Sequence, residues 1–478
     1  MMKSRCHVSL VRLAFVLAAA GLLAAANRAA AETYAIQTVS YVGQAGDSVQ
    51  GVGIQADGTL VVAANISGGP LVAGGVKELG QGNGVVLRLT PDGRRLLSAT
   101  RVAKRVRDLA LDAGDNLYLA ADAEGAVKLD RAAARLLWQR DVGGTCVRIA
   151  AGSDGTSAAL RYGRDDDSAP GAGQLYVFDP QGKPLANFAG HRNTLDVCVD
   201  SASRTVILIG WRQANAFDGK KKEPVQIAYL RGCSYAGQPK YTLYDWSTDN
   251  DAPEFINRPT NNMADTRGYR CAIGRDGNLY CAFECAGGNH IFRWEPQLQD
   301  GQWRSADAKQ PKADQFHAFY NSRAEHKTFM GRYEPASGKY LAGQGLCGRL
   351  SSGRANAARV VNGAVAAAES GALLLGGTSA FGLPLSFTPP ETGDYSGGSH
   401  LLVMQPDLKS RAYCTRFQAG GQTRALDARH VGGKTVIVLG GSNNAKEPGQ
   451  FWTKDALQPN GEAGCGFLAV LTTDATAK

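Results

Sequence analysis

The feature that most constrains this chain is a short phrase that recurs seven times along it. Each copy has a short apolar segment, then Asp-Gly or a similar tight turn, then a second and more apolar segment, which is the pattern of a β-hairpin. The copies occupy residues 51–65, 109–122, 148–162, 197–211, 270–284, 363–377 and 425–441. A variable loop follows each copy and a second hairpin usually comes after it, so most repeats predict a four-stranded antiparallel sheet.

A single sheet of this kind cannot bury the apolar residues on both of its faces, whereas sheets stacked face to face around a ring can. We therefore predict an all-β fold, a β-propeller of about seven four-stranded blades, as one domain spanning residues 32–478. The last repeat has a strand at 466–474 with no further strand after it, while 34–43 has the pattern of a strand without a partner. We expect this N-terminal strand to complete the last blade and close the ring.

Residues 1–31 have the layout of a secretory signal peptide, with basic residues, an apolar run from Leu13 to Ala26, and small residues before the expected cleavage after Ala31. The apolar run, roughly 14 residues, is shorter than the ~20 residues that a transmembrane helix needs. We expect a secreted or periplasmic protein with no transmembrane segment. The alternative is that the run remains as an uncleaved anchor.

The charge of the chain does not favour nucleic acid as a partner. The formal net charge of +9 falls to +5 when the four basic residues of the predicted signal are removed. The remaining basic residues are scattered, and the tight run from Lys220 to Lys222 is followed at once by Glu223. Because nucleic-acid binding needs a basic patch or stripe, we interpret this run as a solvated loop.

Nine cysteines follow the predicted signal, an odd number for a chain expected in an oxidising compartment. Cys281 and Cys285 form a C-x3-C pair in one predicted strand, and Cys271 lies on the preceding strand of the same hairpin. We expect a disulfide among these three cysteines, with a spare thiol. The alternatives are unpaired structural cysteines and a zinc site, but a fourth zinc ligand is not evident and C-x2-C spacing is more usual.

Two stretches of the chain share a longer order of elements, namely a hairpin, a Gly/Ser-rich loop, a strand ending in a Pro-Asp turn, and a closing strand. They are GDSVQGVGIQADGTLVVAANISGG with GVVLRLTPDGRRLLSATRV, and residues 371–417. This order of elements and residues resembles the SBBP type of bacterial β-propeller repeat, most clearly in the first, sixth and seventh repeats and least in the fifth. The resemblance implies a secreted propeller that serves as a scaffold, and it carries no catalytic residues to transfer.

Function on a propeller usually depends on loops that converge at the central channel, so long polar insertions are the first candidates. Two insertions flank the first hairpin of the fifth repeat, at 247–270 and 285–328. Their amides, carboxylates, arginines, histidine and tryptophan suit a polar ligand, and we therefore predict a binding site there. The candidate ligand-binding residues are Asn261, Asn262, Asp265, Arg267, Arg270, Glu284, His290, Arg293 and Trp294.

The same composition has a simpler explanation, because Asn and Asp cap turns in long surface loops and Arg pairs with them. Among cofactors the oxygen-rich residues would suit calcium, although the spacing of a helix-loop-helix calcium loop is missing. The chain contains neither C-x-x-C-H nor G-x-x-x-x-G-K-[ST], so we expect no haem and no nucleotide. G-x-S-x-G and H-E-x-x-H, typical of hydrolases and zinc proteases, are also missing.

These observations favour a non-catalytic binding or interaction module that holds a polar ligand, or a protein or glycan partner, on its loop face. The alternative is a propeller hydrolase or lactonase, in which a metal near the channel activates water or polarises a carbonyl. That alternative requires Glu284 and Asn262 to converge on one metal with Asp265 or His290. A quinone-dependent dehydrogenase is disfavoured, because the chain has no vicinal cysteine pair and no repeated tryptophan docking motif.

Overall fold

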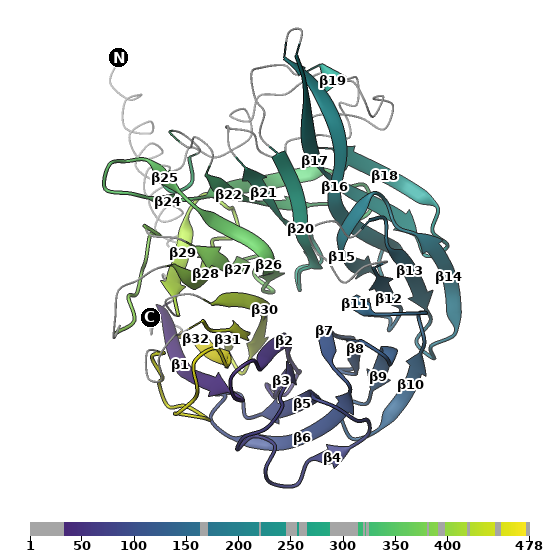
Figure 1. The fold of residues 1–478 in the computed structure, drawn as a ribbon, viewed down its shortest axis with the longest axis vertical. Helices are drawn as coiled ribbons and strands as arrows, with labels where there is room; N and C mark the ends of the chain where they lie inside the picture. Colours follow the sequence, from purple (N-terminus) through teal and green to yellow (C-terminus); the bar gives the residue numbers. More distant parts are fainter. Residues whose placement is uncertain are drawn as a thin grey trace, which may run out of the picture.

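The computed structural model describes residues 33–162, 171–218, 221–244, 256–257, 265–286, 314–318, 321, 325–379, 382–390, 397–417, 421–444 and 451–474. In this part of the chain every regular element is a β-strand, and seven sheets built on four antiparallel strands follow one another around a ring (Figure 1). The predicted seven-bladed β-propeller is confirmed.

The first four blades follow the chain, each from its innermost strand to its outermost. Blade one consists of β2 (Ser48–Ile54), β3 (Leu60–Asn65), β5 (Gly84–Leu89) and β6 (Leu96–Ala103), with β4 (Lys77–Glu78) beside β6. Blade two consists of β7 (Val106–Leu111), β8 (Leu117–Ala121), β9 (Gly125–Leu129) and β10 (Leu136–Arg140). Blade three consists of β11 (Cys146–Ala151), β12 (Ser157–Arg161), β13 (Gln174–Phe178) and β14 (Pro184–Ala189). Blade four consists of β15 (Asn193–Asp200), β16 (Thr205–Asp218), β17 (Lys221–Ser234) and β18 (Pro239–Tyr244), with β19 (Ile256–Asn257) beside β16.

The last three blades complete the ring. Blade five consists of β20 (Asp265–Ile273), β21 (Leu279–Ala286), β22 (His326–Tyr333) and β23 (Tyr340–Leu346). A two-stranded hairpin of β24 (Gly348–Arg349) and β25 (Ala355–Asn356) precedes blade six, which consists of β26 (Ala358–Ala367), β27 (Leu373–Ser379), β28 (Gly398–Met404) and β29 (Arg411–Arg416). Blade seven consists of β30 (Gln422–Val431), β31 (Lys434–Ser442), β32 (Gly466–Asp474) and β1 (Thr33–Val42).

The N-terminal strand closes the ring, as the sequence predicts. β1 pairs antiparallel with β32, from Thr33 opposite Asp474 to Val42 opposite Gly466. Val39 of β1 is fully buried. This pairing satisfies the edge of β32, which would otherwise expose a row of unpaired backbone groups.

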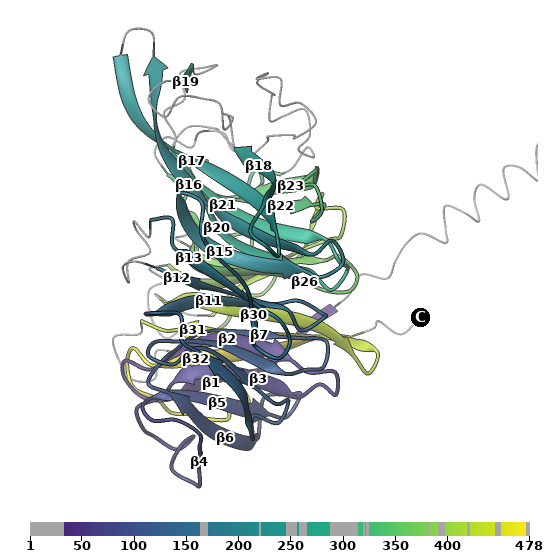
Figure 2. The same cartoon turned by 90° about the vertical axis from the view of Figure 1, so that its right-hand side faces the viewer.

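The two faces of the ring differ. We call one the turn face, because it carries the tight turns between the first and second strands of the blades. We call the other the insertion face, because each innermost strand begins there and the two long segments of the fifth repeat leave β18 and β21 there. The hairpin of β16 and β17 stays paired as far as Asp218 and Lys221, and it extends beyond the other strands (Figure 2).

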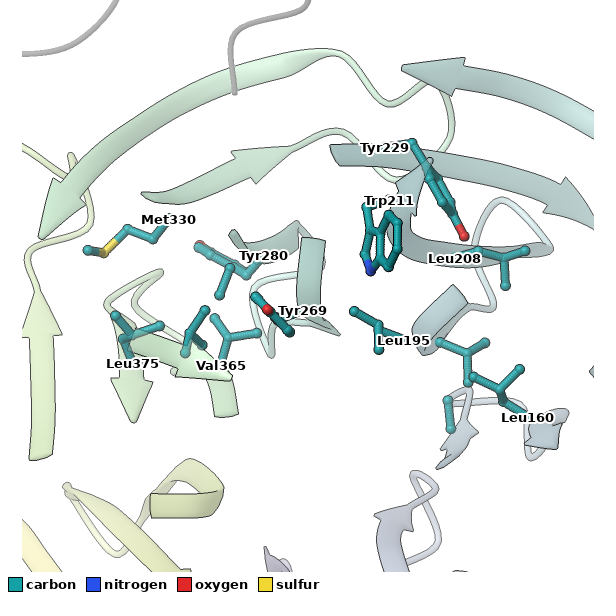
Figure 3. Close-up of a cluster of buried hydrophobic side chains, with 14 of the residues drawn as sticks. Leu160, Leu195, Leu208, Trp211, Tyr229, Tyr269, Tyr280, Met330, Val365 and Leu375 are labelled. Atoms are coloured by element: carbon teal, nitrogen blue, oxygen red, sulfur yellow. The ribbon is translucent and has the colours of Figure 1, made fainter. Parts of the chain in front are cut away.

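The core lies between neighbouring blades, because the central strands of the blades bury side chains on both of their faces (Figure 3). β21 is an example. Tyr280 packs in a cluster with Leu375 of blade six, whereas Phe283, which points to the opposite side of the sheet, packs in a cluster with Ile209 of blade four. This two-sided burial explains why a single repeat would not be stable alone.

On the rim of the ring, aromatic side chains of three outermost strands lie against a glycine in a turn of the next blade. We call these contacts the rim latches. The pairs are Trp138 with Gly182, Phe188 with Gly237, and Tyr241 with Gly338. A β-carbon on these glycines would stand 2.8, 2.6 and 2.7 Å from the nearest ring carbon, and their φ angles are +79°, +81° and +72°. Glycine is therefore required here both by the close approach and by the left-handed backbone.

Candidate functional site

Each innermost strand carries an irregularity at the same height in the channel wall. In six strands one residue is skipped in the pairing with the second strand, which is a β-bulge, and in β26 the irregular stretch runs from Arg359 to Ala364. The bulged residues are Gln50, Arg107, Val147, Leu195, Tyr269 and Arg424. A bulge bends its strand and changes the direction of nearby side chains. The bulges therefore mark one level along the channel axis at which the side chains in the wall are arranged differently.

We call the seven residues that follow these irregularities the channel belt. From blade one to blade seven they are Gly51, Asp108, Arg148, Asp196, Arg270, Ala364 and Ala425. The charge alternates in sign over blades two to five, while blades six, seven and one contribute only Ala and Gly. The belt therefore has a charged half and a small half. The bulged residues Gln50 and Arg424, on the strands of the small half, line the same cavity.

The two aspartates of the channel belt join neighbouring blades. Asp108 accepts the N–H of the next residue at 2.9 Å and the N–H of Ile149 in blade three at 3.1 Å. Asp196 does the same with the N–H of the next residue and with that of Cys271 in blade five, both at 3.0 Å. Because each carboxylate bonds to its own strand and to the next one, these aspartates hold the inner strands in place.

The arginines of the channel belt also contact residues of the following blade. Arg148 Nε lies 3.8 Å from Asp196 Oδ1, and Arg270 Nε donates to the carbonyl of Gly363 in blade six at 2.7 Å. Together with Arg424, three guanidinium groups line the cavity against two carboxylates. The cavity wall therefore carries an excess of one positive charge when both aspartates are ionised.

The channel belt surrounds a cavity of about 220 Å³ that is lined by all seven innermost strands. Toward the turn face this cavity continues into a wider chamber of about 630 Å³, because the two share their lining residues at the junction. The larger shared side chains form a ring that we call the aliphatic collar: Val52, Leu109, Val199, Ile273, Val365 and Leu426. A water molecule takes about 30 Å³ in the liquid, so the channel has room for a small ligand.

Burial changes the acidity of the channel belt. It raises the pKa of Asp108 to about 6, with Arg148 acting against this shift and Asp196 adding to it. Burial also raises the pKa of Asp196, against the effect of Arg270 and Arg148. Carboxyl groups with a raised pKa in a cavity are common at functional sites, because charged groups are placed there despite the cost of desolvation.

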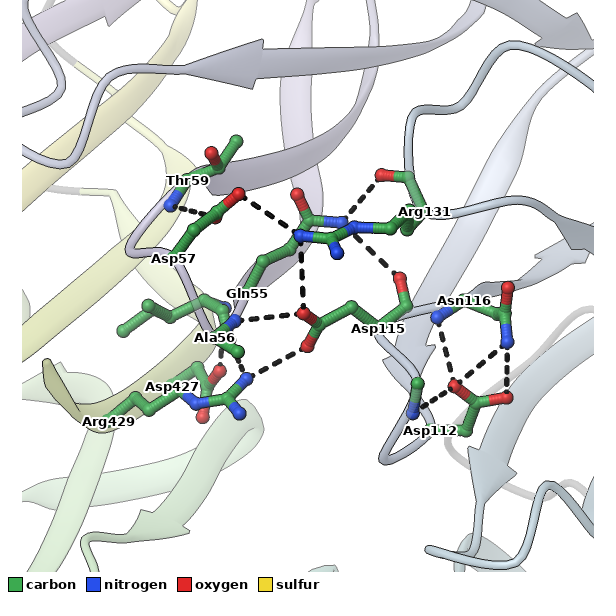
Figure 4. A network of polar contacts seen from close by, with 12 residues as sticks. Gln55, Ala56, Asp57, Thr59, Asp112, Asp115, Asn116, Arg131, Asp427 and Arg429 are labelled. Carbon is green, nitrogen blue, oxygen red and sulfur yellow. Dashed lines mark hydrogen bonds and ion pairs between the residues drawn. The ribbon is translucent and has the colours of Figure 1, made fainter.

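A separate polar network lies at the turn-face mouth of the channel (Figure 4). Arg429 of blade seven pairs with Asp115 of blade two at 2.9 Å, and Asp115 accepts the N–H of Ala56 in blade one at 2.9 Å. Arg275 of blade five reaches Asp427 of blade seven, also at 2.9 Å. Because these charges pair with one another across four blades, we assign this network to the stability of the ring.

The structure describes four of the nine predicted site residues. These are Asp265, Arg267, Arg270 and Glu284. Asn261, Asn262, His290, Arg293 and Trp294 lie outside the described residues. The four described residues all lie on β20 and β21, but only Arg270 belongs to the channel belt.

Glu284 is buried in the seam between blades five and six. Its carboxylate accepts hydrogen bonds from Arg359 at 2.8 and 3.2 Å and lies 2.5 Å from His326 Nδ1. Although burial acts in the opposite direction, the hydrogen bonds from His326 and Arg359 lower the pKa of Glu284. Since both carboxylate oxygens already have these partners, Glu284 is not poised to bind a metal in this arrangement.

Asp265 and Arg267 join blade five to the long hairpin of blade four. Asp265 accepts the N–H of Gln226 at 2.8 Å, and Arg267 Nε donates to the side chain of the same glutamine. The guanidinium of Arg267 also lies 5.7 Å from the centre of the Trp211 ring, a cation–π contact. These contacts support the alternative that such residues serve structural roles.

The residues predicted from the sequence do not include Asp108, Arg148, Asp196 or Arg424, although the repeats carry a signal for the belt. In six blades the belt residue precedes the left-handed residue of the following turn by seven positions, as Arg148 precedes Gly155 and Arg270 precedes Gly277. Aligning the repeats on their turns would thus have brought Asp108, Arg148 and Arg270 into one column. Asp196 would be displaced by one position, because it precedes the left-handed Arg204 by eight.

The nine cysteines after the predicted signal are all buried, and none of them forms a disulfide. The disulfide expected among Cys271, Cys281 and Cys285 is therefore absent from this structure, although Cys271 and Cys281 stand opposite each other in β20 and β21. Both pack as small apolar groups between blades four and five, and burial raises their pKa well above that of a free thiol. In the described residues no group of three or more His, Cys, Asp or Glu side chains is arranged to hold a metal.

Among the described residues no helix has the length and apolar character to cross a membrane. A scan against protein-family models finds no match to this chain, and a search of curated proteins finds no significant similarity. The resemblance to SBBP-type repeats and the expected export of the protein therefore stay predictions.

Proposed function

We propose that this protein is an exported, non-catalytic binding module, an SBBP-like scaffold that holds a polar ligand in the central channel of its propeller. The observation that supports this most is the division of the channel belt. A wall built for stability alone would pair its charges around the whole ring. Here the belt positions of blades two to five carry charged side chains, whereas those of blades six, seven and one carry only Ala and Gly, with Gln50 and Arg424 beside them. The small residues leave room next to polar groups around the cavity, as a ligand site requires.

The proposed site lies in the central channel, whereas the site predicted from the sequence lies in the loops of blade five. Arg270 belongs to both, since it was selected from the fifth repeat and lies in the channel belt. No observation favours the hydrolase or lactonase, because Glu284, the first ligand that it requires, is bonded to Arg359 and His326. A protein or glycan partner is compatible with the proposal if a polar group of that partner enters the channel.

The test is a thermal-shift screen of small polar metabolites and glycan fragments, with isothermal titration of every compound that raises the melting temperature. The blocking variant is Gln50→Trp, which places an indole in the cavity from a partly exposed bulge position. The matched control is Gln181→Trp, which adds the same indole at an exposed turn on the rim.

We expect ligands of the wild type to lose at least tenfold in affinity in Gln50→Trp and to bind Gln181→Trp normally. Ligands that bind both variants as they bind the wild type would place the site outside the channel and refute the proposal. A full screen without any ligand would count against it as well.

A further inference from the structure

We infer that the channel ligand is a small organic anion, with one compact oxyanion group on the belt arginines and a short apolar body in the aliphatic collar. This inference rests on the proposed function, and it adds the chemical class of the ligand. Carboxylates and phosphate monoesters share the oxyanion chemistry, and the experiment below separates them.

Positive charge reaches the cavity from several directions. Arg148, Arg270 and Arg424 come from blades three, five and seven, so guanidinium groups approach the cavity from three sides of the ring. A guanidinium is planar, stays ionised and presents several N–H donors, which suits carboxylate and phosphate oxygens. An anion in this cavity would therefore meet donors on more than one side.

The two aspartates of the channel belt do not make the cavity suitable for a cationic ligand. Each oxygen of Asp108 accepts a backbone N–H, one on its own strand and one on the next blade. Asp196 is engaged in the same way. A cationic ligand would have to compete with these backbone donors, whereas an anion would offset the excess of positive charge in the cavity wall.

The polarity of the wall changes along the channel axis. Beyond the belt, the aliphatic collar offers an apolar wall from six blades. Beyond the collar, the chamber is lined by four acidic residues (Asp112, Asp200, Glu369 and Asp427) and two basic ones (Arg275 and Arg429). The acidic end repels an anionic group, so the oxyanion is directed to the belt and the apolar body to the collar.

The experiment uses isothermal titration with probes of one chain length: hexanoate, hexyl phosphate, hexan-1-ol and hexylammonium. Acetate tests the contribution of the apolar body. The charge variant is Arg424→Gln, which removes one guanidinium from the cavity at a partly exposed bulge position. The control variant is Arg135→Gln, which removes the same charge from a side chain that is 76% exposed on the rim.

We expect hexanoate or hexyl phosphate to bind, and the tighter of the two identifies the oxyanion. Acetate should bind at least tenfold more weakly than hexanoate, and hexylammonium should not bind. Arg424→Gln should weaken the preferred anion at least tenfold, while Arg135→Gln should bind it as the wild type does.

Three results would overturn the inference in different ways. If hexan-1-ol or hexylammonium binds as tightly as the anions and Arg424→Gln has no effect, then the ligand class is wrong while a channel site remains. If no anion binds but the metabolite screen yields a neutral ligand that Gln50→Trp blocks, the inference fails and the proposed function survives. If neither the probes nor the screen gives a channel ligand, both fail.

Discussion

A single backbone position, the one after the inner-strand bulge, carries different chemistry from blade to blade. Asp196 reaches the backbone of the next blade, and Arg270 reaches a carbonyl of the next blade. Gly51 is required for a steric reason, since a β-carbon there would stand 2.4 Å from the Cβ of Leu109 in blade two. The position is therefore the same in each blade, while the side chain at that position differs. Depending on the blade, it joins two blades, places a charge in the channel wall or leaves space for a neighbouring side chain.

The raised pKa of Asp108 predicts a pH-dependent contribution to stability. The folded-state pKa of about 6 exceeds the unfolded value of 3.8, so the stability from this group is full below pH 3.8 and is lost as the pH rises through 6. The total loss is roughly 3 kcal/mol. Asp108→Asn does not titrate. In denaturant unfolding from pH 4 to 7, the wild type should therefore lose up to roughly 3 kcal/mol relative to Asp108→Asn.

The comparison with Asp108→Asn is needed because His400 acts in the opposite direction. Burial lowers the pKa of His400 to about 4, so its contribution to stability is lost as the pH falls below its unfolded value of 6.5. His400 is present in both proteins, and its effect cancels in the difference. A difference between the two proteins that does not change with pH would contradict the burial of Asp108.

The cysteines give a second prediction at the residue scale. The nine cysteines after the predicted signal peptide are all buried, so a thiol reagent should modify none of them quickly in the folded protein. After unfolding without a reductant, the same reagent should find nine thiols in each chain from which the predicted signal peptide, with Cys6, has been removed. A fully reduced sample serves as the control for the total. A count lower by two in the unreduced sample would indicate a disulfide and contradict the structure.

At the scale of strands and turns, the rim latches hold neighbouring blades together. Phe188 of β14 covers Gly237 in the turn between β17 and β18, so an outermost strand of one blade packs on a turn of the next. The aromatic residue and the glycine lie in different repeats. Each latch thus depends on the angle between two blades as well as on local backbone conformation.

Gly237→Ala should destabilise the protein by roughly 2–3 kcal/mol, because alanine is strained at φ +81° and its β-carbon would overlap the Phe188 ring. The control is Gly277→Ala, where φ is +80° and no atom lies within 4 Å of the added carbon. Gly277→Ala should lower the free energy of unfolding by only about 1 kcal/mol, because only its backbone conformation is strained. Equal losses in the two variants, measured by denaturant unfolding, would show that the ring contact does not matter.

The elements were easier to predict from the sequence than the site. Asp-Gly turns between apolar segments determine hairpins locally, so strands, blade number and closure by β1 followed from the repeats. The channel belt joins residues of different repeats, and a bulge leaves no mark in one repeat. For Glu284 the sequence indicated the right kind of residue but not its partner, because Arg359 lies 75 positions away in another blade.

At the scale of the whole molecule, the ring depends on closure by its own N-terminal strand. β1 covers the edge of β32. At the channel side of the same blade, the network at the turn-face mouth joins blade seven to blades one, two and five through Arg429, Asp427 and their partners. Backbone pairing thus holds the outer side of blade seven, and ion pairs hold its innermost strand.

Deletion of Thr33–Val42 should lower the melting temperature by about 10 °C or more, or cause aggregation, because it removes a whole strand and exposes the edge of β32. Deletion of residues 475–478, which follow β32, is the control and should have little effect. If the protein without β1 melted at the temperature of the intact protein and stayed monomeric, closure by this strand would not contribute to stability.

The central claim is that the channel itself is the ligand site. The most direct measurement is an anomalous difference map from crystals soaked in 6-bromohexanoate, because bromine marks the apolar end of the probe. We predict a bromine peak inside the chamber next to the aliphatic collar, with density for the carboxylate between Arg270 and Arg424. Bromine peaks confined to the outer surface, or an empty channel at saturating probe, would contradict the claim.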